Sequence, residues 1–281
     1  MTNKGNKMKF NSELPKCMLA LNTCINDYDF VLLHLYLEDE EYALYFNELR
    51  SRLPYRLMVL DNSAYEFFVK GEELDFNKFY TTIRELKPDY YILPDVLMDK
   101  EKTLAGTRKF LDEYRIPGYS KPMAVAQGNS VEDMIDCLEQ YIEMDIDAVA
   151  IPFHNSFYRE MNVSVNIAKA FMSEYGYINT DIEYTMGRVE FLSQVQDLLK
   201  RFKHVHILGS HCPLEAKFYD YSTMDTGYPV KLAIVGQVLG KEKEKPNIII
   251  DEFYEEELPL ETKALIESNI KKMKQWHESG A

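Results

Sequence analysis

The chain has few cysteines, and the four that it contains form no metal-binding or redox motif. Cys17, Cys24, Cys137 and Cys212 stand far apart, without C-x-C or C-x-x-C spacing. Neither a zinc knuckle nor a disulfide framework is indicated, since both depend on characteristic cysteine spacings. We therefore expect a protein of the reducing cytoplasm that carries no zinc subdomain and needs no cofactor.

Long apolar runs are also missing. None approaches the roughly 20 residues that a membrane-spanning helix requires, so no membrane partner is expected. The N-terminus carries Lys4, Lys7 and Lys9 without an apolar stretch after them, which is not the pattern of a signal peptide. We interpret residues 1–16 as a polar tail.

Positive charge is scarce as well. The sequence has 32 Lys and Arg against 46 Asp and Glu, which gives a formal charge of −14. The field of such a molecule repels a polyanion, so a protein that coats nucleic acid non-specifically is disfavoured. A local basic patch stays open as an alternative.

Glycine-rich phosphate loops of the G-x-G-x-x-G or G-x-x-x-x-G-K type are absent, and short apolar runs recur instead. Most of these runs are nearly continuous in hydrophobicity, as expected of strands buried on both faces of a parallel sheet. Eight such runs begin at Cys17, Phe30, Arg56, Tyr90, Pro122, Asp147, His204 and Tyr221.

Helical patterns lie between the apolar runs. Residues 39–51 and 99–114 place apolar side chains at three- and four-residue spacing, Ser130 is positioned as an N-cap, and a last helix is expected at about 260–276. Strands and helices thus alternate in a chain of 281 residues. This predicts an α/β fold, a (β/α)8 TIM-type barrel that forms a single domain over residues 17–281, with a helical insertion around 157–202.

Polar residues gather at the predicted strand ends. In a barrel, catalytic groups come from the C-terminal ends of the strands. Three aspartates and a glutamine at one barrel mouth are typical of a pocket for a neutral heterocycle or sugar that is rich in hydrogen-bond donors. The candidate residues are Asp61, Asn62, Asp95, Gln127, His154, Gly209, Ser210, His211 and Asp225.

Each candidate also has a structural interpretation. A strand-terminal aspartate such as Asp61, Asp95 or Asp225 can simply cap the following helix. Gln127, which precedes a glycine, can belong to a turn. The histidines can be core residues, because no two of them have a metal-ligand spacing on one helix.

Five segments in order carry a family resemblance. "DNSAYE" (61–66), "YILPD" (91–95), "AVAQGN" (124–129), "HVHILGS" (204–210) and "STMDTGYPVKLAI" (222–234) resemble the guanine transglycosylase superfamily, which includes the queuine and archaeosine tRNA-ribosyltransferases. The chain is more similar to the DNA-modifying branch found in phages and genomic islands than to the tRNA enzymes. The resemblance covers roughly residues 17–236.

The resemblance implies a (β/α)8 barrel that exchanges guanine in a polynucleotide for a 7-deazapurine through a covalent sugar–enzyme intermediate. It implies that Asp225 attacks C1′ and that Asp61 acts as general acid and then base. Asp95, Gln127, Asn62 and Gly209 would bind the base, with His154, Ser210 and His211 as further candidates. The implied partners are a 7-deazapurine base and DNA rather than tRNA, in the host cytoplasm if the protein is phage-encoded.

The residue types suit this chemistry. Departure of a purine builds positive charge on the sugar, which an ionised carboxylate stabilises and can trap covalently. The leaving base needs a proton from a second carboxyl group. A carboxylate at Asp95 can accept hydrogen bonds from guanine N1–H and N2–H₂, while the amide of Gln127 can donate to O6.

Two departures from the family pattern leave alternatives open. The C-x-C-x-x-C zinc site of the tRNA enzymes is missing, and "AIPFHNS" (150–156) replaces the glycine-rich loop that helps bind the incoming base. The identity of that base is therefore open. The same chemistry on tRNA or on a free nucleoside or nucleotide is one alternative. A non-catalytic accessory or binding barrel is another.

Overall fold

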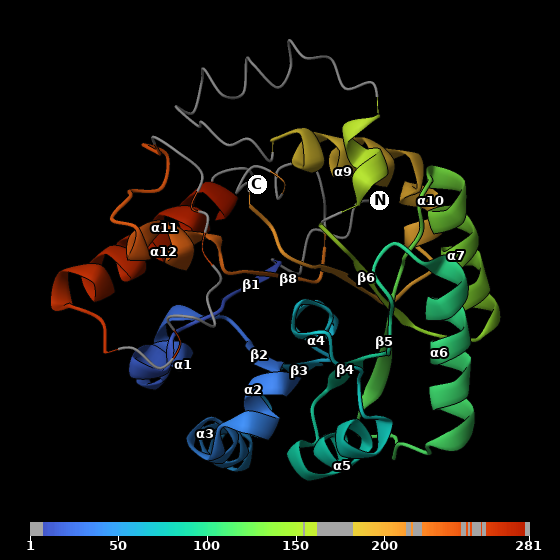
Figure 1. Cartoon of the computed structure of the whole chain (residues 1–281), viewed down its shortest axis with the longest axis horizontal. Coiled ribbons are helices and arrows are strands. Elements are labelled where there is room, and N and C mark those ends of the chain that lie inside the picture. The colour runs from blue at the N-terminus through green and yellow to red at the C-terminus, as the bar shows by residue number, and fades with distance from the viewer. Residues whose placement is uncertain are drawn as a thin grey trace. The chain divides into compact units, whose positions relative to one another are not determined.

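The computed structural model describes residues 8–153, 155–161, 182–211, 215, 221–242, 246, 248, 254 and 257–278. Within these residues, eight strands form one sheet in the order β1-β8-β7-β6-β5-β4-β3-β2. All strand pairs whose register is known are parallel. Helices separate most of the strands along the chain (Figure 1), so the predicted (β/α)8 TIM-type fold is confirmed. The strands are β1 Lys9–Ser12, β2 Asp29–Leu32, β3 Met58–Asp61, β4 Tyr90–Ile92, β5 Lys121–Val125, β6 Ala148–Ile151, β7 His204–Ile207 and β8 Thr223–Thr226.

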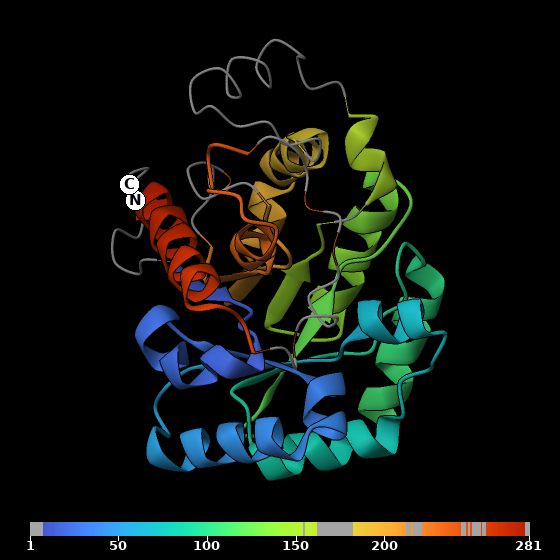
Figure 2. The same cartoon turned by 60° about the vertical axis from the view of Figure 1, so that its left-hand side comes forward.

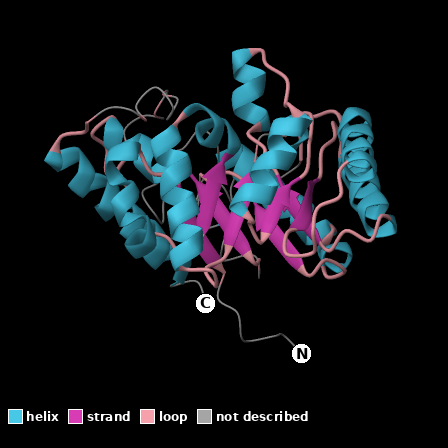
Figure 3. Cartoon of the chain, turned by 90° about the horizontal axis from the view of Figure 1, so that it is seen from below, coloured by secondary structure: helices cyan, strands magenta, loops and turns pink. Residues whose placement is uncertain are grey.

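Most of the helices are longer than the strands (Figure 3). The predicted N-cap at Ser130 is confirmed, because its hydroxyl accepts a hydrogen bond from the Asp133 N–H at 3.1 Å. No described helix is long and apolar enough to cross a membrane. The helices are η1 Lys16–Leu21, α1 Asn22–Ile25, α2 Leu33–Glu38, α3 Glu40–Arg52, α4 Ala64–Lys70, α5 Phe76–Leu86, α6 Lys100–Glu113, α7 Val131–Glu143, η2 Ser156–Arg159, α9 Ile182–Gln194, α10 Gln196–Leu199, α11 Tyr228–Ile234 and α12 Leu260–Glu278.

The prediction for the N-terminus was wrong. The first strand, β1, lies inside the predicted polar tail of residues 1–16, and the apolar run that begins at Cys17 forms the 3₁₀ helix η1 instead. The mixed sequence KFNS forms a strand because its polar groups find partners. Ser12 N–H donates to Oδ1 of Asn26 at 2.8 Å, and the Asn26 amide donates to Ser12 O at 2.9 Å. Pairing with β8 supplies the ladder.

The apolar run from Phe30 to Leu37 was predicted as one strand, but only its first residues, up to Leu32, form a strand. β2 ends at Leu32, and α2 begins at Leu33. The Tyr42 hydroxyl accepts a hydrogen bond from the Leu32 N–H at 3.0 Å, which ends the strand in a buried setting. A continuous apolar run carries no period that separates strand from helix.

The contacts of the chain divide it into two compact units, which we describe one at a time. Unit 1 comprises Met1–Asp27, Phe153–Gln196 and Ile207–Ala281, and unit 2 comprises Tyr28–Pro152 and Asp197–His206. The single-domain prediction therefore stays a prediction. The insertion around 157–202 also stays one, because η2, α9 and α10 fall there but residues 162–181 lie outside the described part.

Unit 2 holds five consecutive parallel strands, β2 to β6, with α3, α5, α6 and α7 outside them. These strands are buried on both faces, since consecutive residues such as Val59 and Leu60 are both fully buried, as are Ile92, Ala124 and Val149. Outside the strands, α3 and α5 lie side by side (Figure 2). This layer arrangement leaves the strand ends free to carry polar groups.

Unit 1 contains β1, β8 and the helices η1, α1, η2, α9, α11 and α12. Helix α12 packs along α11, and Asn269 of α12 donates to Pro229 O at 3.2 Å and accepts from Leu239 N–H at 2.9 Å. Helix α9 packs so closely on η2 that a Cβ at Gly187 would lie 2.0 Å from the Tyr158 carbonyl oxygen.

Candidate active site

Three of the predicted site residues in unit 2 form one hydrogen-bonded cluster. The Asn62 amide nitrogen donates to Asp95 Oδ1 at 2.7 Å, and the Gln127 amide nitrogen donates to Asp95 Oδ2 at 2.7 Å. Asn62 and Gln127 are almost fully buried, whereas Asp95 is partly exposed. The carboxylate is thus held between two amide donors with an accessible face.

This arrangement changes the pKa of Asp95. Burial raises the pKa of the carboxyl group above its ordinary value, and the hydrogen bonds from Asn62 and Gln127 offset part of that rise. The alternative that Asp95 caps a helix was wrong, since the N-cap of the next helix, α6, is Asp99. Asp95 is instead a carboxylate presented by side-chain amides.

The amide of Gln127 is anchored at both ends. Its Oε1 accepts a hydrogen bond from the Met98 N–H at 3.0 Å, which places the amide nitrogen toward Asp95. The interpretation of Gln127 as a simple turn residue is therefore wrong. One amide hydrogen remains beyond the bond to Asp95, so Gln127 can donate one hydrogen bond to a ligand.

Asp61 and Asn62 stand where β3 turns into α4. Asp61 Oδ2 accepts from the Ser63 N–H at 2.8 Å, and Asn62 Oδ1 accepts from the Ala64 N–H at 2.9 Å. Ser63 has a left-handed backbone, with φ 56° and ψ 35°, and its hydroxyl lies 2.9 Å from Nδ1 of the buried His34. The N-cap of α4 is Ser63, so the alternative that Asp61 caps this helix was wrong; Asp61 bonds to the backbone N–H of the cap residue and is half-buried.

In unit 1, Asp225 lies inside β8 and is 4% exposed. Its Oδ1 accepts a hydrogen bond from the Gly209 N–H at 3.1 Å, and its carbonyl oxygen accepts from the Ser210 N–H at 3.0 Å. The N-cap of α11 is Gly227, and the Thr226 hydroxyl accepts from the Tyr228 N–H at 3.0 Å. The first turn of α11 therefore bonds to Thr226, the neighbour of Asp225.

The remaining candidates in unit 1 have other surroundings. Ser210 is fully buried and donates its hydroxyl hydrogen to Glu215 Oε2. His211 packs on Phe153 and Tyr228, with ring centroids 4.3 and 5.1 Å apart, which fits an aromatic packing role. His154 lies outside the described residues.

The structure therefore brings the predicted residues together in two groups. Asn62, Asp95 and Gln127 bond to one another in unit 2, with Asp61 beside Asn62 in the chain. Gly209, Ser210 and Asp225 bond to one another in unit 1. Among the described residues, no group of three or more His, Cys, Asp or Glu side chains could hold a metal ion.

Two buried charged residues in unit 1 escaped the sequence analysis. Arg188 of α9 and Glu215 form an ion pair with their side chains 0% and 1% exposed. The only sequence signal was an arginine after Gly187 within the apolar segment "TMGRVEFL" (185–192). Such a residue is rarely buried without a partner.

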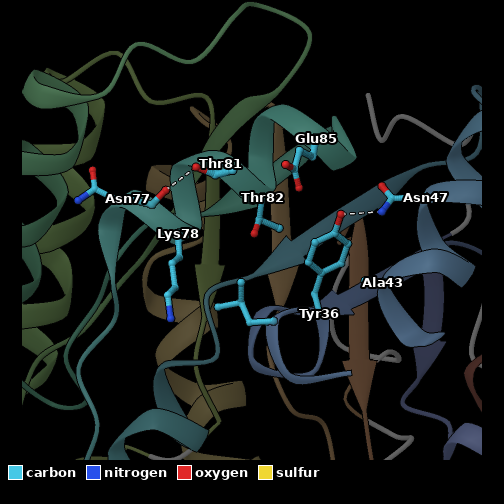
Figure 4. A pocket seen from close by; sticks show the side chains of 9 residues that line it. Tyr36, Ala43, Asn47, Asn77, Lys78, Thr81, Thr82 and Glu85 are labelled. Carbon is cyan, nitrogen blue, oxygen red and sulfur yellow. Dashed lines mark hydrogen bonds between the residues drawn. The ribbon is translucent and has the colours of Figure 1, made fainter. Parts of the chain in front are cut away.

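A separate pocket of about 470 Å³ lies in unit 2, against α2, α3 and α5 (Figure 4). At one side of it the Asn47 amide nitrogen donates to the Tyr36 hydroxyl at 2.7 Å, and Thr81 and Glu85 line it from α5. None of the predicted site residues lines this pocket. Comparison of the chain with models of known protein families and with curated proteins found no match.

Proposed function

We propose that this protein is a base-exchange N-glycosyl transferase that replaces guanine in DNA with a 7-deazaguanine derivative. The observation that carries the proposal is the arrangement of Asp95 between the Asn62 and Gln127 amides. A carboxylate beside an amide donor is complementary to the guanine edge, which offers N1–H and N2–H₂ next to O6.

Base selection follows from these groups. Asp95 accepts from N1–H and N2–H₂, and the remaining amide hydrogen of Gln127 donates to O6. Adenine offers an acceptor at N1 and a donor at N6, so both partners would face groups of the wrong kind. Unpaired buried polar groups discriminate strongly against a ligand.

The exchange takes place in two displacements. In the first, a carboxylate oxygen of Asp225 bonds to C1′ as the C1′–N9 bond breaks, and the departing guanine takes the bonding electrons and a proton from Asp61. In the second, Asp61 removes a proton from the incoming base, whose nitrogen bonds to C1′ while the bond between C1′ and Asp225 breaks. Each carboxyl group thus returns to its starting state.

The proposed base contacts use the Watson–Crick edge of guanine, which is paired in a duplex, so the substrate must present a guanine outside the base stack. A duplex would have to flip the nucleotide out, and single-stranded or looped DNA would lower that cost. The formal charge of −14 favours a second candidate, a free nucleoside or nucleotide, since it disfavours a broad polyanion surface.

The test measures guanine release. Purified protein is incubated with a 7-deazaguanine base and with guanine-labelled DNA, tRNA or dGTP in parallel, and the released guanine is counted. We expect release from DNA, its loss in Asp225→Asn, and a covalent DNA–protein adduct on denaturing gels with the wild type.

The other results are equally informative. If guanine is released only from dGTP, or only from tRNA, that molecule and not DNA is the substrate. No release from any substrate, with no adduct and with Asp225→Asn indistinguishable from the wild type, would refute the transferase proposal and favour the accessory or binding barrel.

A further inference from the structure

Arg188 and Glu215 form a two-point ion pair in the interior of unit 1. Arg188 Nε lies 2.8 Å from Glu215 Oε1, and Arg188 Nη2 lies 2.8 Å from Oε2. Both side chains are excluded from solvent, at 0% and 1% exposure. Burying two charges is unfavourable unless both are well paired, and a buried pair alone adds little to stability. The pair therefore needs another explanation.

The remaining contacts of the pair converge on one short segment, residues 208–210. Arg188 Nη1 donates to the carbonyl oxygen of Leu208 at 2.6 Å. Glu215 Oε2 accepts the hydroxyl hydrogen of Ser210. The ion pair thus holds the segment on both sides of Gly209.

The same segment bonds to β8 on its other side. Gly209 N–H donates to Asp225 Oδ1 at 3.1 Å, and Ser210 N–H donates to Asp225 O at 3.0 Å. Ser210 O accepts the hydroxyl hydrogen of Thr226. Gly209 has φ +60°, a conformation that only glycine adopts readily, so the direction of its N–H depends on how the segment is held.

We propose that Arg188 and Glu215 are positioning residues that hold segment 208–210 so that the Gly209 N–H orients the Asp225 carboxylate. This rests on the proposed role of Asp225 as nucleophile. A hydrogen bond to one oxygen fixes the rotation of the carboxylate and so the direction in which it meets C1′. Small errors in that direction reduce the rate steeply.

Close packing of α9 positions the Arg188 side chain. Gly187 lets α9 approach the backbone of η2 to a depth that any Cβ would prevent. The guanidinium carbon of Arg188 lies 4.8 Å from the ring centroid of Phe153, which covers it. The planar guanidinium bonds to both carboxylate oxygens of Glu215 through two separate nitrogens and to Leu208 O through the third. The single nitrogen of an ammonium does not reproduce this planar two-point geometry.

The main test is the double variant Arg188→Met with Glu215→Met, which removes both charges and leaves neither unpaired. We expect a folded protein whose kcat for guanine release from DNA falls about tenfold while KM is unchanged, since the variant loses an orientation needed only for the attack. The single variant Arg188→Lys keeps the positive charge but not the planar set of N–H donors. We expect it to recover less than half of the kcat that the double variant loses.

The matched control is Arg159→Met. Arg159 of η2 pairs with Glu183 of α9, the helix that carries Arg188, at 3.1 Å, but both side chains are more than half exposed. Loss of an exposed pair has little effect, so kcat should stay within about twofold of the wild type. Should the double variant fail to fold, Ser210→Ala removes the hydroxyl that bonds to Glu215 and is expected to lower kcat about threefold.

Two further results separate this inference from the proposed function. If the wild type releases guanine and the double variant has the same kcat as the wild type, the positioning role is refuted and the transferase proposal stands. Where the double variant is unfolded, an unchanged kcat in Ser210→Ala leads to the same conclusion. If the wild type is inactive, amide hydrogen exchange at residues 208–210 decides whether the pair holds the segment. Faster exchange in the variant supports the holding role, and unchanged exchange overturns it.

Discussion

The backbone N–H of Gly209 donates a hydrogen bond to Oδ1 of Asp225 over 3.1 Å. The next N–H, of Ser210, donates to the carbonyl oxygen of the same aspartate at 3.0 Å. Asp225 is therefore held through its side chain and its backbone by two consecutive amides. The bond from Gly209 to the carboxylate is charge-assisted, and such bonds are stronger than neutral ones, whereas the bond from Ser210 is an ordinary backbone bond.

The first prediction concerns Gly209→Ala. Gly209 has φ +60°, and a Cβ there would meet Phe153 Cβ at an ordinary 3.5 Å, so the strain is conformational rather than steric. We expect a loss of about 1–2 kcal/mol in the free energy of unfolding, measured with urea. Guanine release should fall about tenfold as the N–H turns away from Asp225.

Gly236→Ala is the control for this prediction. Gly236 lies in the same unit with φ +73°, and among the described residues no atom beyond its chain neighbours lies within 4 Å of its Cβ position. Its replacement carries a similar conformational strain at the C-terminal end of α11. Equal losses of activity in both variants would show that strain alone, and not the bond to Asp225, lowers the rate.

The second prediction concerns pH. Burial raises the pKa of Asp95, so its carboxyl group binds a proton at a higher pH than an exposed aspartate does. The protonated form no longer accepts from both N1–H and N2–H₂ of guanine. Measured by titration calorimetry, the affinity for guanine should weaken as the pH falls through the raised pKa, and Asp95→Asn should bind weakly at every pH.

The raised pKa of Asp95 has the opposite effect on stability, because protonation of Asp95 weakens guanine binding but favours the folded state. The folded state binds the Asp95 proton more tightly than the unfolded chain, so this group makes the free energy of unfolding decrease as the pH rises between the ordinary and the raised pKa. Asp95→Asn should remove this slope. A wild-type slope that persists in the variant would assign the titration to another group.

The strand ends could be predicted because the sequence carries their signal locally. Buried parallel strands give continuous apolar runs, and the first polar residue after each run marks the end that bears function, as at Asp95 and Gln127. β1 could not be predicted in this way. The strand has only one large apolar residue, Phe10, and depends on Asn26 and on β8 for its hydrogen bonds.

Arg188 and Glu215 illustrate the other limit. The two residues are 27 positions apart, and neither has a spacing that names its partner. Their pairing depends on how α9 packs on η2, which is a tertiary property. The hydrogen bonds that join Asn62 and Gln127 to Asp95 are likewise set by the register of neighbouring strands, although the residues themselves were predicted.

The third prediction concerns Asn62→Ala. The Asn62 amide nitrogen donates to the Leu93 carbonyl oxygen at 2.6 Å and to Asp95 Oδ1 at 2.7 Å. The Asn62 Oδ1 accepts from the Ala64 N–H at 2.9 Å. Its removal leaves buried polar groups without this partner, so the free energy of unfolding should fall by about 1–3 kcal/mol in urea. Guanine affinity should fall with it as Asp95 loses one of its two amide donors.

Asn47→Ala tests whether burial is the reason. Asn47 also donates one short bond, to the Tyr36 hydroxyl at 2.7 Å, but beside the open pocket of Figure 4, where water can replace it. We expect a loss below about 1 kcal/mol in the same urea experiment. The Asn47 side chain makes one such bond and the Asn62 side chain three, so a loss as large as that of Asn62→Ala would show that neither burial nor the number of bonds sets the effect.

The fourth prediction compares two glycines inside helices, Gly187 of α9 and Gly106 of α6. Alanine stabilises an unobstructed helix position by about 0.5–1 kcal/mol, and Gly106→Ala should do so, since its Cβ would meet Pro94 at 3.8 Å. A Cβ at Gly187 would lie 2.0 Å from the backbone oxygen of Tyr158, which cannot move without displacing η2. We therefore expect Gly187→Ala to lower the free energy of unfolding by about 1–3 kcal/mol despite the gain in helix propensity. Opposite signs in urea denaturation would confirm the close packing of α9 on η2, whereas a stabilising Gly187→Ala would show that α9 does not lie at this depth, and Arg188 would then lose its position beside Glu215.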